Sequence, residues 1–378
     1  MTTKSLADYD RAIQLNPNNA IAYNNRGLVK FDLGKNQEAI ADYNRAIQLN
    51  SNYADAYKNR GNAKSELGKN QKAIADYDRA IQLDPNNANA YNNRGLAKSD
   101  LGINQEAIAD YDRAIQLDPN NANAYVNRGL AKSALGKNQE AIADYDRAIQ
   151  LDSNYDVAYN NRGNAKSDLG KNEKAIADYD RAIQLDPNYD VAYVNRGLAK
   201  SALGKNKEAI ADYDRAIQLD SNYDVAYYNR GNAKYALGKN QEAIADYDQV
   251  IQLDPNDANA YSHRGLAKSA LGRKEEAIAD YDRAIQLDPN DAAAYYNRGS
   301  AKSALGKNQE AIADYDQVIQ LDPNEAFAYY NRGSAKSALD DKQSAIEDYQ
   351  KAADLYKQQG KTYMYQVAVD NVKKLSKQ

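Results

Sequence analysis

The feature that most constrains this chain is a sequence that repeats every 34 residues. One copy runs from Ala88 to Asn121, the next begins at Ala122, and closely similar copies follow along nearly the whole chain. A fixed period of this length is the signature of stacked structural repeats. In such a stack each unit buries its apolar surface against its neighbours, so no single central core is needed. The period therefore predicts one domain, although 378 residues would otherwise suggest two or more.

Within one copy, two stretches carry apolar residues at helical spacing. Residues 90–101 and 105–117 each place them at i, i+3, i+4 and i+7, which marks one apolar stripe on each helix. Gly102, between the two stretches, can adopt the positive φ that ends a helix. Pro119 follows the second stretch and cannot continue it. Each unit is therefore predicted to be a pair of antiparallel helices joined by a short turn.

This helix pair resembles the tetratricopeptide repeat, whose pattern is a large aromatic residue, then Gly, Ala, an aromatic residue, Ala and Pro. The matching residues are Tyr91, Gly95, Ala107, Tyr111, Ala114 and Pro119. One departure is Arg94, where the family often has Leu. The resemblance covers almost the entire chain. It implies an all-α fold, an α-solenoid in which helix-turn-helix units form a right-handed superhelix with the first helices on its concave wall.

The period also divides the chain into three parts. Residues 1–19 match only the second half of a unit, so we expect an N-terminal half-repeat with a single helix, Leu6–Leu15. Residues 20–359 hold ten repeats, and residues 360–378 are predicted to form a C-terminal capping helix with one apolar stripe. The ten repeats start at residues 20, 54, 88, 122, 156, 190, 224, 258, 292 and 326.

Composition excludes several classes of function. A formal net charge of −4, with both signs interspersed, argues against nucleic acid as a partner. No run of some 18 apolar residues could span a membrane. Residues 1–4 have no apolar segment, so we expect no signal peptide and a cytoplasmic location. With no Cys and one His, acid–base and nucleophilic chemistry have little to draw on, and we expect no enzyme, no cofactor and no metal.

One polar position recurs two residues after the first Tyr of each repeat. It is Asn in nine repeats and His in one: Asn25, Asn59, Asn93, Asn127, Asn161, Asn195, Asn229, His263, Asn297 and Asn331. A side-chain amide offers donors and an acceptor that match the N–H and C=O of an extended peptide. The column resembles the asparagine ladder of tetratricopeptide arrays that bind extended chains. The alternative is that each Asn bonds a neighbouring helix or is simply solvated.

A second peptide-binding arrangement of the family, the carboxylate clamp of chaperone-binding members, fits less well. Lys58, Asn62 and Asn93 match its first three places. Asn123 and Asn127 stand where the family has Lys and Arg. Without those cations a C-terminal carboxylate loses its charge-assisted hydrogen bonds.

Aromatic residues gather on the first helices toward the C-terminal end. They are Tyr228, Tyr235, Tyr296, Phe327 and Tyr330. Because aromatic side chains anchor most binding hot spots, we predict an apolar pocket over the seventh to tenth repeats. The alternative is that these rings pack on one another between adjacent helices.

A triad of charged residues recurs in the repeats as Arg94, Lys98 and Asp110. Antiparallel helices would bring the Arg or Lys near the Asp, within one repeat or across to the next. Because partly buried cations need such a partner, we interpret this triad as structural.

The sequence therefore predicts a non-enzymatic scaffold that binds an extended peptide segment of a partner protein in its concave groove. The partner would be a protein or peptide, with no nucleic acid and no membrane span. The chain would be a monomer or associate weakly end to end through Leu6–Leu15. Two alternatives stay open: a structural, self-assembling rod, designed or consensus arrays included, and a regulatory arm cut from a larger protein.

Overall fold

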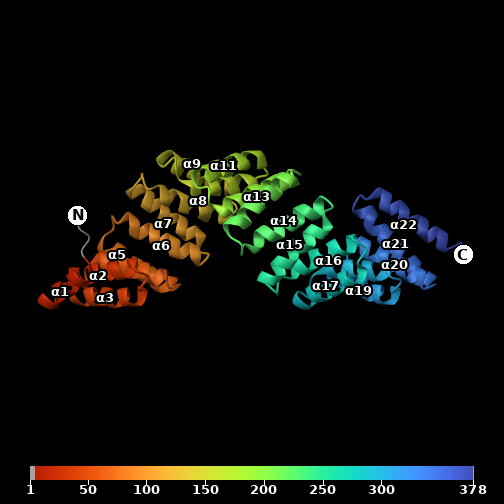
Figure 1. Ribbon diagram of the computed structural model, residues 1–378, viewed down its shortest axis with the longest axis horizontal. Coiled ribbons are helices and arrows are strands. Elements are labelled where there is room, and N and C mark those ends of the chain that lie inside the picture. Colours follow the sequence, from red (N-terminus) through yellow and green to blue (C-terminus); the bar gives the residue numbers. More distant parts are fainter. Residues whose placement is uncertain (1–4, 378) are drawn as a thin grey trace. The chain divides into compact units, whose positions relative to one another are not determined.

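The structure is a computed structural model that describes residues 5–377 (Figure 1). Residues 1–4 of the predicted half-repeat, where we expect no signal peptide, and Gln378 of the predicted cap lie outside this range. All regular secondary structure within it is α-helical, in 22 helices. Contacts divide the chain into two compact units, residues 1–187 and 188–378, which are described separately.

The first unit contains eleven of the helices. They are α1 Leu6–Leu15, α2 Ala20–Asp32, α3 Asn36–Leu49, α4 Ala54–Ser65, α5 Asn70–Leu83, α6 Ala88–Asp100, α7 Asn104–Leu117, α8 Ala122–Ala134, α9 Asn138–Leu151, α10 Asp156–Asp168 and α11 Asn172–Leu185.

The second unit contains the other eleven. They are α12 Asp190–Ala202, α13 Asn206–Leu219, α14 Asp224–Ala236, α15 Asn240–Leu253, α16 Ala258–Ala270, α17 Lys274–Leu287, α18 Ala292–Ala304, α19 Asn308–Leu321, α20 Ala326–Ala338, α21 Lys342–Gln358 and α22 Thr362–Leu375.

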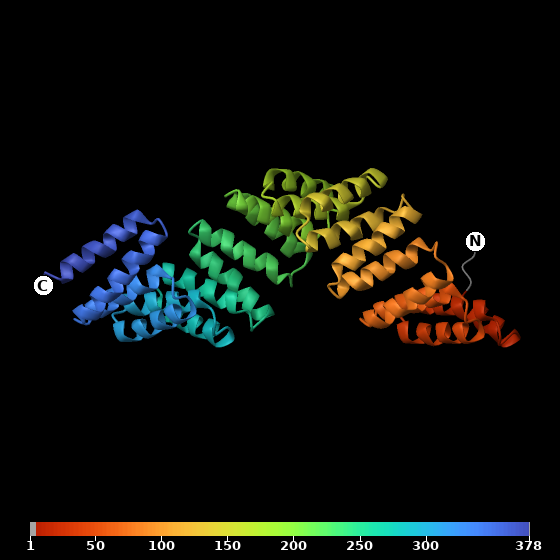
Figure 2. The ribbon, with the colours of Figure 1, turned by 180° about the vertical axis from the view of Figure 1, so that it is seen from behind.

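Within each unit the helices stack as successive hairpins, as the two views show (Figure 1 and Figure 2). The even-numbered helices from α2 to α20 are the first helices of the repeats, and the odd-numbered helices from α3 to α21 are the second. Each second helix in a unit packs against its own first helix and the next one. Neighbouring first helices in a unit also contact each other directly. Within each unit every helix thus packs against its chain neighbours, which confirms the predicted all-α solenoid; the division into domains stays a prediction.

The turns and caps follow from local sequence. Gly102 has a φ of 76°, as the turn between α6 and α7 requires. In the tenth repeat Asp340 takes this place with a φ of 64°, the one non-glycine residue of the described range with positive φ. Six of the ten first helices begin with a side-chain cap; in α6 the Oδ1 of Asn87 accepts the backbone N–H of Ala90 at 3.1 Å. The other four, α4, α10, α12 and α14, have Tyr at this position and no such bond.

A glycine and a tyrosine set the distance between the two helices of a hairpin. Tyr111 on α7 is fully buried, and its ring lies directly against Gly95 on α6. A Cβ atom at Gly95 would lie 2.6 Å from Cε1 of Tyr111, closer than real side chains approach. The hairpin can therefore close around the ring only because residue 95 has no side chain.

At the C-terminal end, α22 covers the last hairpin. Ala368 is buried, and Met364, Tyr365 and Val369 pack against a cluster that contains Leu355 and Tyr356 of α21. The outward side of α22 is polar and exposed, as at Lys373 and Lys374.

Candidate functional site

The candidate site is the face formed by the first helices of each unit. Every residue of the predicted ladder lies on a first helix, from Asn25 on α2 to Asn331 on α20. Asn59 is buried, and the other members are partly exposed. Because neighbouring first helices in a unit contact each other, the ladder residue of one repeat lies close to the first helix of the adjacent repeat.

In the first unit, three ladder amides donate hydrogen bonds to the preceding first helix. The Nδ2 of Asn59 donates to Oδ1 of Asn24 at 3.0 Å, and Asn127 donates in the same way to Asn92 at 3.1 Å. Asn93 instead donates to Oδ1 of Asn62 at 2.9 Å. Bonds to a neighbouring helix were the alternative interpretation of the ladder, and the structure contains them.

The second unit orients its ladder residues differently. The Nδ2 of Asn331 donates to the hydroxyl of Tyr296 on the preceding first helix at 2.8 Å, again between neighbouring repeats. Asn229 donates within its own helix to the carbonyl of Val225 at 2.8 Å. The Nδ1 of His263 lies 2.9 Å from the carbonyl oxygen of Asn259, also on its own helix. The side chain of Asn297 makes no hydrogen bond with any other described residue.

These bonds leave hydrogen-bonding capacity on the face. A carboxamide has two N–H donors, and no ladder Asn considered above donates more than one bond within the described chain. Asn25 and Asn161 accept bonds from Asn24 and Asn160 at 3.2 and 3.5 Å but donate none to described residues. Each of these amides therefore keeps at least one N–H; whether the ladder binds a ligand stays a prediction.

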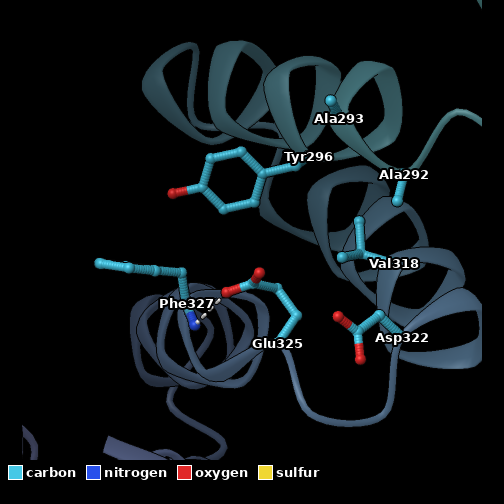
Figure 3. A pocket seen from close by; sticks show the side chains of 7 residues that line it. All are labelled: Ala292, Ala293, Tyr296, Val318, Asp322, Glu325 and Phe327. Atoms are coloured by element: carbon cyan, nitrogen blue, oxygen red, sulfur yellow. Dashed lines mark hydrogen bonds between the residues drawn. The ribbon is translucent and has the colours of Figure 1, made fainter. Parts of the chain in front are cut away.

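Two of the predicted groove aromatics line one cavity. Tyr296 of α18 and Phe327 of α20 border a space of about 540 Å³, with Val318, Asp322 and Glu325 on its other sides (Figure 3). The cavity lies in the second unit and is bordered by residues from the start of α18, the end of α19 and the start of α20.

The other three aromatics lie elsewhere. Tyr228 borders a smaller cavity of about 160 Å³, and Tyr235 packs in a cluster around Tyr247. The ring of Tyr330 packs on that of Tyr349, with centroids 5.3 Å apart, and its hydroxyl accepts a bond from Asn371 of α22 at 3.2 Å. Thus the five aromatic residues do not line one common cavity. Tyr228, Tyr296 and Phe327 border cavities, as the pocket interpretation predicts, whereas Tyr235 and Tyr330 pack on other rings, as the alternative predicts.

Sequence reasoning missed an apolar position on the same face of the first unit. Leu96 and Leu130 are 38% and 44% exposed and border a cavity of about 270 Å³ beside the ladder residue Asn127. A signal was present, because this repeat position is Leu in some repeats and Asn or Ser in others. Where it is Asn, as at Asn62, the side chain accepts a bond from the buried hydroxyl of Tyr77 at 2.9 Å.

The charged triads form the predicted structural pairs. Asp76 is buried and accepts from Nε and Nη2 of Arg60 at 2.9 and 2.6 Å and from Nζ of Lys64 at 2.6 Å. Pairing within a repeat is therefore confirmed.

Pairing across repeats occurs as well. The Nη1 of Arg94 bonds Asp78 of the preceding repeat at 2.6 Å, while its other nitrogens hold Asp110. Burial alone would lower the pKa of Arg94, but the hydrogen bonds with Asp110 and Asp78 outweigh it and raise the pKa.

The residues that match the carboxylate clamp are also engaged. The Nζ of Lys58 pairs with Oδ1 of Asp55 on its own helix at 2.8 Å. Asn62 and Asn93 are hydrogen-bonded to each other, as described above.

Among residues 5–377 no helix has the length and apolar character needed to cross a membrane.

Known structures share this fold. A tetratricopeptide repeat protein from Parabacteroides merdae is 22% identical, with a TM-score of 0.52 over 66% of this chain and 98% of that one. The pilF protein of Pseudomonas aeruginosa is 20% identical, with a TM-score of 0.50 over 55% and 94%. The Cut9–Hcn1 hetero-tetramer of APC/C contains a chain 16% identical, with a TM-score of 0.51 over 98% and 87%. No curated protein sequence matches the chain.

Sequence models of one family match along the chain. A model described as TPR repeat matches residues 2–34, 27–68, 61–102, 100–136, 129–170, 200–238, 231–272 and 269–306. Two models described as Tetratricopeptide repeat match residues 157–189 and 292–325, and residues 328–359. Since these matches together cover well over half of the sequence and the helices form the corresponding hairpins, the chain belongs to the tetratricopeptide repeat family.

Proposed function

We propose that this protein binds an extended peptide segment of a partner protein along its first-helix face. Proteins of this family bind protein or peptide partners, and a scaffold for protein–protein interactions is the typical, non-catalytic use of the fold. The finer proposal concerns which surface is used and what form the partner takes.

The observation that supports it most is the set of ladder amides that keep an unused N–H. For four of them, Asn59, Asn93, Asn127 and Asn331, a hydrogen bond to the neighbouring first helix restricts the side-chain rotamers, so less conformational entropy would be lost when a peptide binds. Amides at one position of successive first helices would bond the backbone of an extended peptide without reading its side chains. The formal net charge of −4 is consistent with a protein partner rather than nucleic acid.

A comparison of three baits tests the proposal. The first is the wild type, and the second carries Asn161→Ala and Asn297→Ala, the ladder residues with the fewest bonds inside the chain. The matched control carries Gln139→Ala and Gln309→Ala, which remove two exposed amides from the second helices α9 and α19. Circular dichroism first establishes that all three are equally folded.

Quantitative mass spectrometry then compares the proteins that each bait retains from a lysate. We expect a set of proteins retained by the wild type and the control but depleted on the ladder variant. Equal retention by all three baits would refute peptide binding through the ladder.

A second candidate is end-to-end association of copies through α1. It is favoured by two large apolar side chains near this end, Leu15 and Ile21, which are 79% and 61% exposed. Sedimentation equilibrium of the wild type and of Leu15→Lys tests it. A mass that rises with concentration only in the wild type would support association, and a constant monomer mass would exclude it.

A further inference from the structure

Building on the proposed function, we propose that the cavity between Tyr296 and Phe327 binds a lysine or arginine side chain of the partner segment. The cavity of about 540 Å³ has an aromatic wall, an aliphatic wall and two carboxylates (Figure 3). The long aliphatic stem of lysine or arginine would pack against the aromatic and aliphatic walls, and its terminal cation would pair with the carboxylates.

The two carboxylates have no cation partner. Asp322 accepts the backbone N–H of Asn324 at 2.9 Å, and Glu325 accepts that of Phe327 at 3.2 Å. Each thereby uses one oxygen, and no Lys or Arg nitrogen of the described residues lies within 4.0 Å of either group. Asp314 of α19, by contrast, pairs with both Arg298 and Lys302. Asp322 and Glu325 can therefore form charge-assisted bonds with a cation from outside.

Helix ends around the cavity favour the same charge. Asp322 directly follows the C-terminus of α19, where the last carbonyl groups carry partial negative charge. The N-termini of α18 and α20, which would repel a cation, are capped by the carboxylates of Asp291 and Glu325. The negative groups thus dominate the cavity.

The aromatic wall suits a cation as well. The ammonium group of Lys361 already lies 4.9 Å from the centroid of the Phe327 ring, which shows that this ring accepts a cation on its surface. Behind Phe327, the ring of Tyr356 packs at 5.3 Å and is fully buried, and its hydroxyl has no hydrogen-bond partner in the described chain.

A second, smaller cavity lies two repeats earlier, and three of its residues, Tyr228, Val250 and Asp257, occupy the repeat positions of Tyr296, Val318 and Glu325. Its other carboxylate, Asp224, stands at the position of Ala292, and Asn259 takes the place of Phe327. Only the repeats that begin at 224 and 292 combine Tyr before the ladder position with Val in the second helix, where the other repeats have Ala. The same two substitutions therefore accompany a cavity both times. The smaller volume of about 160 Å³ makes the Tyr296 cavity the main site.

Other occupants fit less well. An apolar side chain would cover two carboxylates without replacing the hydrogen bonds that they make to water. An acidic side chain would meet like charges on Asp322 and Glu325. A basic side chain avoids both penalties.

Neutral variants of equal shape test the proposal. The cavity variant carries Asp322→Asn and Glu325→Gln, which remove both charges and keep both acceptor oxygens. The matched control carries Asp118→Asn and Asp288→Asn, at the position of Asp322 in two other repeats. Asp118 and Asp288 accept the backbone N–H groups of Asn120 and Asn290 at 3.2 and 3.0 Å, and neither lines the cavity. Circular dichroism and thermal melting compare the folds.

A random peptide library displayed on phage is selected on the wild type and both variants. We expect Lys and Arg to be enriched at one peptide position on the wild type and the control and not on the cavity variant. In the selected peptide, replacement of that residue by norleucine, which lacks the ammonium group, should weaken binding to the wild type about tenfold or more, equivalent to about 1.4 kcal/mol. The cavity variant should show little change.

Three results separate the two proposals. Peptides without a basic preference, or a norleucine effect of equal size on wild type and cavity variant, would overturn the cavity assignment and leave peptide binding intact. If no peptide is enriched on any protein, peptide binding itself fails. In that case saturation-transfer NMR with Nα-acetyl-lysine methylamide and its norleucine analogue still tests the cavity. A lysine signal that is no stronger than norleucine, or is unchanged in the cavity variant, would refute it.

Discussion

At the scale of single residues, the absence of one methyl group controls how closely each hairpin closes. A Cβ at Gly163 would lie 2.5 Å from Cε1 of Tyr179, whereas at Gly333 its nearest contact, the carbonyl oxygen of Ala345, would lie at 3.2 Å. Alanine gains about 1 kcal/mol of helix propensity over glycine, and overpacking a buried ring costs about 1–3 kcal/mol.

Because the 2.5 Å overlap at Gly163 places the overpacking cost in the upper part of this range, we expect Gly163→Ala to lower the free energy of unfolding by about 1–2 kcal/mol. Gly333→Ala should leave it within about 0.5 kcal/mol. Guanidinium denaturation followed by circular dichroism measures both. Equal effects of the two variants would mean that the tyrosine ring moves aside at little cost.

The buried tyrosines also predict a dependence on pH. Burial raises the pKa of Tyr111 to about 12, partly offset by its hydroxyl contact with Ser99. Because the folded state holds this proton more tightly than the unfolded state, the associated stability is complete below the unfolded pKa of about 10. It is lost as pH rises from about 10 to about 12, by up to about 1.4 kcal/mol per pH unit.

The variant Tyr111→Phe isolates this contribution. Near neutral pH it should be about as stable as the wild type, since the Tyr111 hydroxyl has only a 3.4 Å contact with Ser99. At about pH 11 the variant should be the more stable of the two by about 1 kcal/mol. Denaturation curves at several pH values give the difference, and a difference that does not change with pH would contradict this origin.

At the scale of the helix pair, a buried carboxylate joins the two helices through two cations. Asp110 of α7 is held by Arg94 and Lys98 of α6. We expect Asp110→Ala to lower the free energy of unfolding by about 3 kcal/mol, because it takes the buried carboxylate away from two partly buried cations and leaves them only the more exposed Asp78 and Glu106. Asp112→Ala removes a half-exposed carboxylate that bonds only Arg128, and should cost no more than about 1 kcal/mol.

A double-mutant cycle with Arg94→Ala then measures the coupling. The combined variant should lose less stability than the sum of the single variants, by at least about 1 kcal/mol. Additive losses would show that Arg94 and Asp110 stabilise the hairpin independently.

At the scale of the whole molecule, we expect the terminal helix α22 to contribute more to solubility than an internal repeat does. Deletion of residues 361–378 removes α22 and uncovers the apolar cluster with Leu355 and Tyr356. Deletion of one repeat, residues 258–291, joins two equivalent positions and leaves the array capped. We expect the first deletion to reduce solubility and to increase binding of an apolar dye clearly more than the second. Equal effects would show that α22 is not a cap.

The repeat period made most of the fold predictable from sequence. Gly102 and Pro119 mark where helices end, and Tyr111 opposite Gly95 marks how they pack, so the hairpins follow from local signals. The candidate site was less predictable. Asn59 and Asn93 occupy the same repeat position yet donate to different positions of the preceding helix, because the available acceptor differs between repeats. Likewise, the hydroxyl of Tyr330 accepts a bond from Asn371 of α22, a contact that no repeat pattern encodes.

The double pairing of Arg94 has a genetic consequence. Its partners Asp78 and Asp110 stand 16 residues before and 16 residues after it, so every bond in this link lies well inside one period. Unequal recombination that gains or loses whole multiples of 34 residues would leave each such arginine with a side-chain partner on both sides, which before Arg60 is Asn44 in place of Asp. The number of repeats can therefore change during inheritance while the junctions between them stay intact, and near-identical copies are the expected trace of such events.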